Sequence, residues 1–243
     1  MGLREVSIDS EIESARPEQP QTGEAVPQPA KTSPTRFLLV RHGQSTWNHE
    51  RRIQGQLDPP LSEGGRRQAA RLGQRLAHRR LAGFYSSDLK RAFETAELIG
   101  QAIGAEATPM PELREIFLGE WEGLRTDEIA ERYPQAWARW REEPNWDLVP
   151  GGESAALFEA RVAAALESIF NRHERGEVLL VTHGGVIQIA LGRVVGRASR
   201  GLFPFKIQNA SISVIEKSNS RVVVSGVNDI AHLESGSEAD VLG

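Results

Sequence analysis

Short apolar runs alternate with longer amphipathic stretches along most of the chain. Continuous apolar runs of four or five residues are typical of strands that are buried on both faces of a sheet. Such a run predicts a strand at residues 37–40, and the segments "GFYSS" (83–87) and "EVLLV" (177–181) are interpreted as two further short strands. Two further segments, 210–217 and 221–227, are separated only by "SNS" and predict an antiparallel pair.

Apolar residues recur at helical spacing between these runs. Ser62 is a suitable N-cap, and the spacing after it predicts a helix over residues 62–80. Ser87 or Asp88 is expected to cap the next helix, Ser154 a long third one, and residues 185–195 form a fourth. Strands alternating with helices predict an α/β fold, a three-layer α/β/α sandwich around a mainly parallel sheet with an antiparallel edge strand.

The remaining segments divide the chain into a domain and two tails. Residues 1–35 are rich in Pro, Glu, Gln and Ser and are interpreted as a disordered tail, and residues 234–243 as a second one. The domain then covers residues 36–233. Within it, residues 110–150 are irregular, rich in Trp and broken at Pro134, Pro144 and Pro150, which indicates an excursion over the sheet with one or two short helices.

Composition narrows the classes of function. The 243 residues include no cysteine, which excludes disulfides and cysteine nucleophiles and is consistent with a cytoplasmic protein. The net charge is −4, of which residues 1–35 contribute −3 and residues 229–243 contribute −4, so the body between them is about +3. That charge suits an anionic small molecule but is too weak for a nucleic-acid partner. The sequence contains no run of 18 apolar residues, so no membrane span is predicted.

Two of the predicted strands end in the same way. "FLLVRHG" at 37–43 and "VLLVTHGG" at 178–185 each run from apolar residues into a histidine followed by glycine. Ligands of open α/β sheets bind at the carboxyl ends of parallel strands, so His42 and His183 are expected to converge on one crevice. The glycines are expected to let a ligand approach the backbone closely.

Two arginines are expected at the same sheet edge. Arg41 precedes His42 directly, and Arg91 falls in the first turn of the helix that follows residues 83–87. A guanidinium is a planar fork suited to phosphate, and a helix N-terminus also favours an anion. Two arginines beside two histidines repel one another unless an anion binds between them, so this cluster predicts a phosphate site.

Five motifs occur in the order found in a known family: "LLVRHGQSTWN", "SSDLKRAFETA", "LREIFLGEWEG", "PGGES" and "VTHGG". With them the chain resembles the histidine phosphatase superfamily, which has the phosphoglycerate-mutase-like fold, over roughly residues 36–233. The resemblance implies that His42 is the nucleophile that becomes phosphohistidine and that Glu115 is the proton donor. It also implies that the phosphoryl group or the substrate is held by Arg41, Asn48, Gln54, Arg91, His183 and Gly184. It implies no metal and no cofactor.

Departures from the mutases of this family favour a phosphatase. Only 35 residues separate Glu115 from "GGES", where mutases carry a longer insertion, and "HGG" stands where they have "HGN". We therefore expect a metal-independent phosphomonoesterase that hydrolyses small-metabolite phosphates. Candidate substrates are phosphoglycerate, phosphoserine, sugar phosphates and a nucleotide-loop phosphate such as ribazole phosphate.

Several alternatives remain open at this stage. The chain could be a cofactor-dependent phosphoglycerate mutase, or a phosphate-binding module without catalysis. Glu115 could be an ion-pair partner of Arg114 instead of a proton donor, and Arg51 or Arg52 could meet a second anionic group. Most of the five tryptophans are expected to pack the excursion, with one or two at the substrate entrance: Trp47, Trp121, Trp137, Trp140 and Trp146. A homodimer is also possible.

Overall fold

The computed structural model describes residues 33–198, 200–201, 204–219 and 221–234. The first strand begins at Thr35, one residue before the predicted start of the domain. Apart from residues 33–35 and 234, the two predicted tails lie outside the described residues.

Within the described residues the strands form one six-stranded sheet of order β3-β2-β4-β1-β5-β6. The strands are β1 (Thr35–Arg41), β2 (Leu81–Ser86), β3 (Thr108–Pro109), β4 (Glu177–Thr182), β5 (Ile212–Ser218) and β6 (Arg221–Asp229). The first four run parallel, whereas β5 pairs antiparallel with both β1 and β6. The predicted mixed sheet is thus confirmed, with the antiparallel pair of β5 and β6 at one edge. The short β3 was not predicted because a two-residue strand leaves no hydrophobic pattern.

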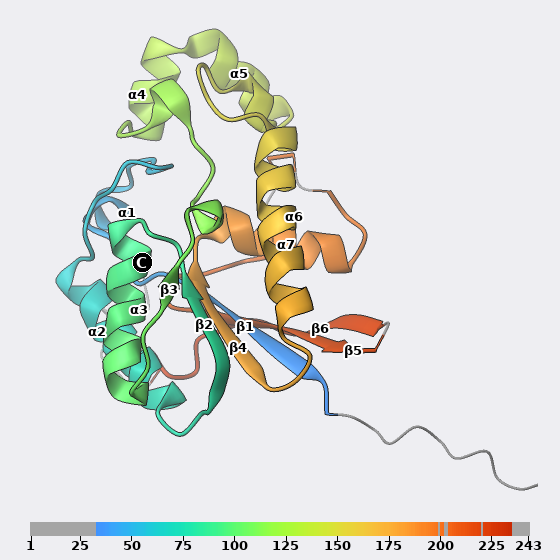
Figure 1. Ribbon diagram of the computed structural model, residues 1–243. Coiled ribbons are helices and arrows are strands. Elements are labelled where there is room, and N and C mark those ends of the chain that lie inside the picture. Colours follow the sequence, from blue (N-terminus) through green and yellow to red (C-terminus); the bar gives the residue numbers. More distant parts are fainter. Residues whose placement is uncertain (1–32, 199, 202–203, 220, 235–243) are drawn as a thin grey trace, which may run out of the picture. The chain divides into compact units, whose positions relative to one another are not determined.

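Alternate residues of β1 face two different helical layers. Phe37 and Leu39 belong to the apolar cluster that contains α6 (Ala155–Arg172) and α7 (Gly184–Val194). Leu38 and Val40 belong to the cluster with α2 (Glu63–Leu76) and α3 (Lys90–Ile103). Because successive side chains of a strand point to opposite faces, both faces of the sheet are buried, as the continuous apolar run predicts. Figure 1 shows the two helix pairs on either side of the sheet, which confirms the three-layer sandwich.

Helix boundaries agree with the prediction at some ends and not at others. Ser62 and Ser154 are N-caps, and their hydroxyls accept from the N–H groups of Gly65 and Leu157. The predicted end of α2 at residue 80 is wrong, because the helix ends at Leu76 and the chain then turns toward β2. The predicted cap of α3 is also wrong: its N-cap is Leu89, with no side-chain cap.

The excursion carries two short helices, as expected. They are α4 (Thr126–Arg132) and α5 (Pro134–Glu142), accompanied by 3-10 turns at Pro111–Leu113, Gly119–Trp121 and Trp146–Leu148. A further short helix, α1 (Thr46–Glu50), follows β1. In Figure 1, α4 and α5 lie at the end of the domain opposite the start of β1.

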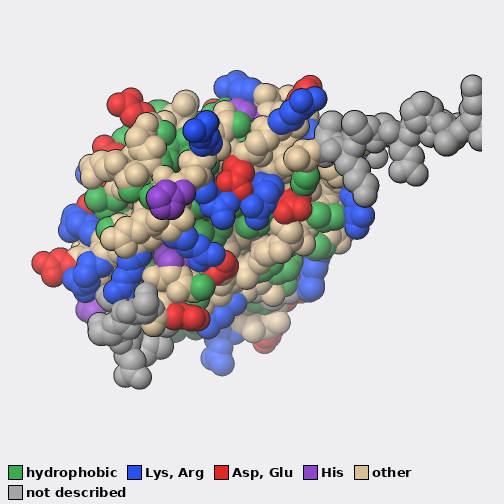
Figure 2. Space-filling model, turned by 90° about the horizontal axis from the view of Figure 1, so that it is seen from below, with side chains coloured by type: hydrophobic (Ala, Val, Ile, Leu, Met, Phe, Trp, Pro, Cys, Tyr) green, Lys and Arg blue, Asp and Glu red, His purple; other side chains and the backbone are tan. Residues whose placement is uncertain are grey.

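The face at the other end of the domain carries mixed charge. Figure 2 shows basic and acidic side chains interspersed there, without a continuous basic surface. Ion pairs link β1 with its neighbours β4 and β5: Arg36 contacts Glu177 and Glu216, and Arg79 contacts Glu177. Among the described residues, none of the helices has the length and apolar character needed to cross a membrane.

Candidate active site

The two strand-end histidines lie side by side. β1 and β4 are neighbours in parallel register, with Arg41 opposite Thr182, so the next residue of each strand is a histidine at the same edge. The ring centroids of His42 and His183 are 5.1 Å apart, and the two residues are only 3% and 0% exposed. The structure therefore brings together the pair that the sequence pattern singled out.

One nitrogen of His42 is held by its own backbone. Nδ1 lies 2.7 Å from the carbonyl oxygen of Gly43, which can only accept a hydrogen bond. Nδ1 therefore carries the proton of the neutral ring, and Nε2 keeps its lone pair. Nε2 in turn lies 3.3 Å from Nε of Arg91, which donates to it. This tautomer leaves Nε2 as the nucleophilic atom.

Arg91 is buried at the start of α3 and held by loop carbonyls. It is the second residue of the helix and only 1% exposed. Its two terminal nitrogens donate to the carbonyl oxygens of Leu57 and Gly55, at 2.9 and 2.7 Å. Burial lowers the pKa of Arg91 to about 10, so the guanidinium is still charged at neutral pH. A fixed positive charge therefore stands against the nucleophilic nitrogen.

Two buried nitrogen atoms at this site lack a partner among the described residues. Arg41 donates through one terminal nitrogen to the carbonyl oxygen of Ile207 at 2.7 Å, but its Nε has no acceptor. His183 has Nε2 2.8 Å from the hydroxyl oxygen of Ser87, whereas its Nδ1 has no partner. Buried polar groups normally have a partner, so these two atoms point to a bound ligand, and Nε of Arg41, which can only donate, requires that ligand to accept a hydrogen bond.

The electrostatics keep both histidines neutral. Burial, followed by the charge of Arg91, holds the pKa values of His42 and His183 well below the usual range for histidine. Burial also lowers the pKa of Arg41, while the carboxylate of Glu115 opposes that shift. Glu115 is the only carboxylate among the described residues that line the cavity with the two guanidiniums, a balance that suits an anion-binding crevice.

Glu115 is fastened at the start of α7. Its two carboxylate oxygens accept from the N–H groups of Ile116 and Gly185, each at 3.0 Å. A side chain at Gly185 would place a Cβ 2.2 Å from one of these oxygens, so only glycine leaves room for the carboxylate. Arg114 pairs with Asp88 at 2.6 Å, and that pairing lowers the pKa of Asp88. The alternative of a Glu115–Arg114 ion pair is therefore wrong.

A partly buried arginine fixes the loop that carries Glu115. Arg161 of α6 donates to the carbonyl oxygens of Glu112, Arg114 and Glu115, at 2.8, 3.0 and 3.3 Å. Its guanidinium is held in turn by both carboxylate oxygens of Glu153, the glutamate of "PGGES". Arg161 and Glu153 thus position the backbone from which the Glu115 side chain extends.

Of the two predicted binding residues Asn48 and Gln54, only Gln54 lines the cavity beside the histidines. Asn48 belongs to a capping box at the start of α1, where its side-chain oxygen accepts from the N–H of Ser45 and from the amide of Asn209. It does not line the cavity beside the histidines. Gln54 lines that cavity and accepts from the hydroxyl of Ser45 at 2.7 Å. Gly184 is the first residue of α7, and a Cβ there would lie 3.8 Å from Nε of Arg41.

Comparison with known proteins agrees with this geometry. The profile of the histidine phosphatase superfamily (branch 1) matches residues 37–230. The chain belongs to this superfamily. The match includes both strand-end histidines, both arginines and Glu115, and it confirms the predicted family and enzyme class, a histidine phosphatase.

Relatives within the histidine phosphatase superfamily cover most of the chain. A metal-independent phosphoserine phosphatase from Arabidopsis thaliana is 37% identical over 204 residues, which are 83% of this chain and 84% of the relative. Phosphoserine phosphatase 1 from Hydrogenobacter thermophilus is 38% identical over 198 residues, covering 82% and 94% of the two chains. The structure of Bacillus stearothermophilus YhfR has a TM-score of 0.74 and 36% identity, and covers 82% and 98%. The two phosphoserine phosphatases favour the phosphatase over the mutase alternative.

Some residues of this histidine phosphatase site were not predicted. Asn209 donates to the carbonyl oxygens of His42 and Gly43 and so holds the end of β1. It belongs to the segment "NASIS", but no apolar pattern marks an asparagine as buried. A packing role of the glycine after His42 was not predicted either: a Cβ at Gly43 would lie 2.5 Å from the carbonyl oxygen of Gly65, so Gly43 is needed for packing against α2.

A cavity of about 340 Å³ opens onto the histidine phosphatase site. Its phosphate end is formed by Arg41, His42, Arg91 and Glu115. Its other walls come mainly from the excursion and include Ile116, Leu118, Trp121, Trp137, Trp140 and Trp146. The expected number of tryptophans at the entrance, one or two, is too low. Four of the five tryptophans line this cavity, and only Trp47 does not.

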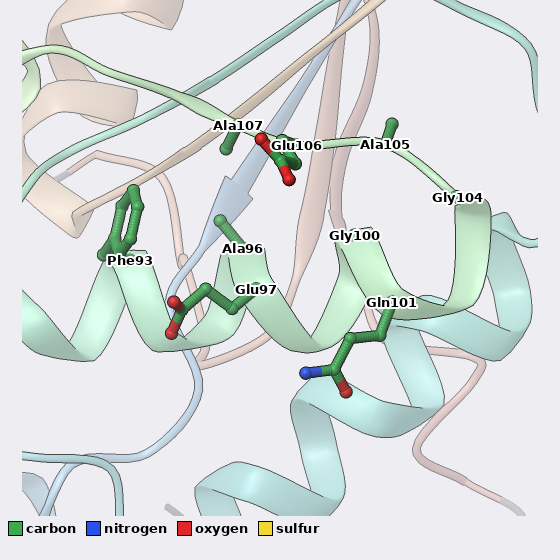
Figure 3. A pocket seen from close by; sticks show the side chains of 9 residues that line it. All are labelled: Phe93, Ala96, Glu97, Gly100, Gln101, Gly104, Ala105, Glu106 and Ala107. Atoms are coloured by element: carbon green, nitrogen blue, oxygen red, sulfur yellow. The ribbon is translucent and has the colours of Figure 1, made fainter.

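A larger cavity of about 760 Å³ lies elsewhere, between α3 and residues 104–107 (Figure 3). It is lined mainly by small residues, and none of the described residues that line it is basic. Its only charged groups are Glu97 and Glu106, which would repel a phosphate. Size alone therefore does not identify the site, and the smaller cavity beside the histidines carries the chemistry.

Proposed function

We propose that the chain hydrolyses phosphomonoesters of small molecules in two steps through a phosphohistidine at His42. In the first step, Nε2 of His42 attacks phosphorus, a P–N bond forms, and the P–O bond to the alcohol breaks. Glu115 gives its proton to the leaving oxygen. In the second step, water attacks phosphorus and gives its proton to Glu115, the P–N bond breaks, and inorganic phosphate leaves.

The observation that carries this proposal is the state of His42. Its ring is buried and neutral, with Nδ1 committed to the Gly43 carbonyl and the Nε2 lone pair directed at a guanidinium. A solvated imidazole would exchange between tautomers, whereas this ring presents one nitrogen only. Fixed orientation of a nucleophile removes much of the entropic cost of the reaction.

Three donors surround the nucleophile and suit the transferring group. They are the Nε atoms of Arg41 and Arg91 and, if Ser87 donates its hydroxyl proton to Nε2, the Nδ1–H of His183. In the transition state of phosphoryl transfer, the negative charge is spread over three oxygens, and fixed donors in a site without water stabilise that charge strongly. This arrangement supplies the charge that a metal ion supplies in other phosphatases.

Metal independence is part of the proposal. The Arabidopsis thaliana relative is described as metal-independent. Among the described residues, no group of three His, Asp and Glu side chains is placed to hold a metal ion. We therefore expect chelation by EDTA to leave the rate of p-nitrophenyl phosphate hydrolysis unchanged.

The decisive experiment traps the intermediate. Enzyme mixed with phosphorus-32-labelled phosphomonoester and quenched within one turnover is expected to carry label that is stable in alkali, labile in acid, and located on His42 by peptide mapping. The His42→Ala variant serves as the control and should carry none. Turnover without such a label would contradict the two-step route. Binding of phosphate without turnover of any ester would indicate the non-catalytic module, and bisphosphate-dependent exchange between phosphoglycerates would indicate the mutase.

A further inference from the structure

The cavity beside His42 has an aromatic wall built by the excursion. Trp121 and Trp140 pack edge to face with ring centroids 5.4 Å apart, and Trp140 and Trp146 are 4.7 Å apart. Trp137 packs against Trp121 at 5.9 Å. Trp121 and Trp146 are almost fully buried, so these contacts fix the position of the wall. We call these four residues the tryptophan wall.

Charge is distributed unevenly along the cavity. The phosphate end holds Arg41, His42, Arg91 and Glu115, whereas the tryptophan wall continues into Ile53, Ile116 and Leu118. Arg52 is the only charged residue among the described lining residues away from the phosphate end. A bound ester would therefore have its phosphate in the charged end and its organic group against apolar side chains.

Arg52 is already paired with acidic side chains. Its guanidinium donates to the carboxylates of Glu50 and Glu128, both at 3.1 Å, and to the carbonyl oxygen of Gly123 at 2.8 Å. The expectation that Arg52 meets a second anionic group of the substrate is therefore not supported. A substrate carboxylate placed here would approach two glutamates together with one arginine and would lose its hydration beside the tryptophan wall.

We propose that the preferred substrates are phosphate esters of an apolar group about the size of one ring, and not esters that carry a carboxylate beside the phosphate. This inference rests on the proposed function and specifies its substrate class. The cavity volume of about 340 Å³ is near the lower end of the range for ligand sites, roughly 300–1,000 Å³. One ring fits such a volume, whereas a nucleotide or a long acyl chain would extend beyond it.

The test compares esters of primary alcohols, so that the leaving groups are chemically alike. We expect kcat/KM of the wild-type enzyme for 2-phenylethyl phosphate to exceed that for ethyl phosphate by roughly 10- to 100-fold, the effect of burying one ring. For phosphoserine, kcat/KM should be no higher than for ethyl phosphate. A value for phosphoserine above that for 2-phenylethyl phosphate would overturn the inference and leave the proposed phosphatase mechanism intact.

A matched pair of variants locates the preference. Trp140→Leu removes the central ring of the tryptophan wall and should lower the ratio of the two kcat/KM values, 2-phenylethyl over ethyl, by about 10-fold. Trp47→Leu removes a tryptophan that packs over Gly123 outside the cavity lining, and the ratio should stay at the wild-type value. If the ratio of Trp140→Leu also stayed at the wild-type value, the tryptophan wall would not select the substrate.

A binding measurement keeps the inference testable if Trp140→Leu fails to fold or if no ester is turned over. Benzylphosphonate and ethylphosphonate have P–C bonds that cannot be hydrolysed, so their affinities for the wild-type protein report the cavity alone. We expect benzylphosphonate to bind at least 10-fold more tightly. Equal affinities would overturn the substrate class, whereas tight binding without turnover of any ester would overturn the proposed function only.

Discussion

The ends of β1 and β4 look alike in sequence but differ in their hydrogen bonds. Both strands run from buried apolar residues into a histidine followed by glycine, and both histidines are fully enclosed. At the end of β1, a local carbonyl fixes the tautomer of His42 and leaves its outer nitrogen facing Arg91. At the end of β4, His183 is held by Ser87 from the end of β2, and its Nδ1 has no partner among the described residues. Equivalent positions in a sheet thus acquire different chemistry from their neighbours.

Replacement of each histidine in turn should separate the two strand ends most strongly. We expect His42→Ala to lower kcat by about 10⁶, the scale for loss of a nucleophile. His183→Ala should lower it by only about 10²–10³, the scale for loss of one donor to the transition state. Single-turnover rates with p-nitrophenyl phosphate measure both. Equal losses would mean that the two histidines act as one unit.

Glu115 belongs to the β4 side, since it is bound to the N-terminal turn of α7. The Glu115→Gln variant keeps the shape of the side chain but has no proton to give. We expect it to slow hydrolysis of ethyl phosphate by roughly 10²–10⁴, because a poor leaving group needs the proton. The loss on p-nitrophenyl phosphate should be much smaller. A comparison of kcat for the two esters tests the assignment, and similar losses on both would contradict it.

Arg161 should act through Glu115 as a positioning residue. Without the guanidinium, three carbonyl groups of the Glu112–Glu115 loop lose a donor, and a displacement near 1 Å costs up to about 100-fold in rate. We expect Arg161→Met to lower kcat for ethyl phosphate by roughly 10- to 100-fold and to spare p-nitrophenyl phosphate, as Glu115→Gln does.

The control for Arg161 is Arg193→Met. Arg193 lies in α7 and pairs with Glu167 at 2.7 Å on the surface, so its loss removes an arginine–glutamate ion pair away from the site. Both esters should be turned over by this variant at the wild-type rate. If Arg161→Met slowed both esters equally, its role would be general stability instead of the placement of Glu115.

The smallest expected effect concerns stability and pH, and it treats the two strand ends alike. Burial holds the pKa values of His42 and His183 below those of the unfolded chain, so below pH 6.5 the unfolded state binds more protons. Stability therefore falls as pH falls through this window, by up to about 1.4 kcal/mol per pH unit for each histidine. The free energy of unfolding, measured by urea titration at several pH values between 7.5 and 5, should depend less steeply on pH for His42→Gln and for His183→Gln than for the wild type. An unchanged slope would mean that the replaced histidine does not contribute.

Most of the strands and helices were predicted from the local pattern of apolar and polar residues. Continuous apolar runs identified the central strands, helical spacing identified α2, α3, α6 and α7, and serines marked two of the helix starts. The convergence of His42, His183 and Arg91 also followed, because residues after neighbouring parallel strands meet at one edge. The errors fell where pattern is weak: the cap of α3, the end of α2, and the two-residue β3.

The sequence by itself determined the three-layer sheet and the edge where the histidines and arginines gather, because periodicity and strand ends are local properties of the chain. Only the tertiary structure decided that Nε2 of His42 faces Arg91, that Arg114 pairs with Asp88, and that Arg52 pairs with Glu128. It also decided that four tryptophans form one wall. The physical reason is that a hydrogen bond or a ring contact depends on partners tens of residues away, and no local pattern records which partner a side chain meets.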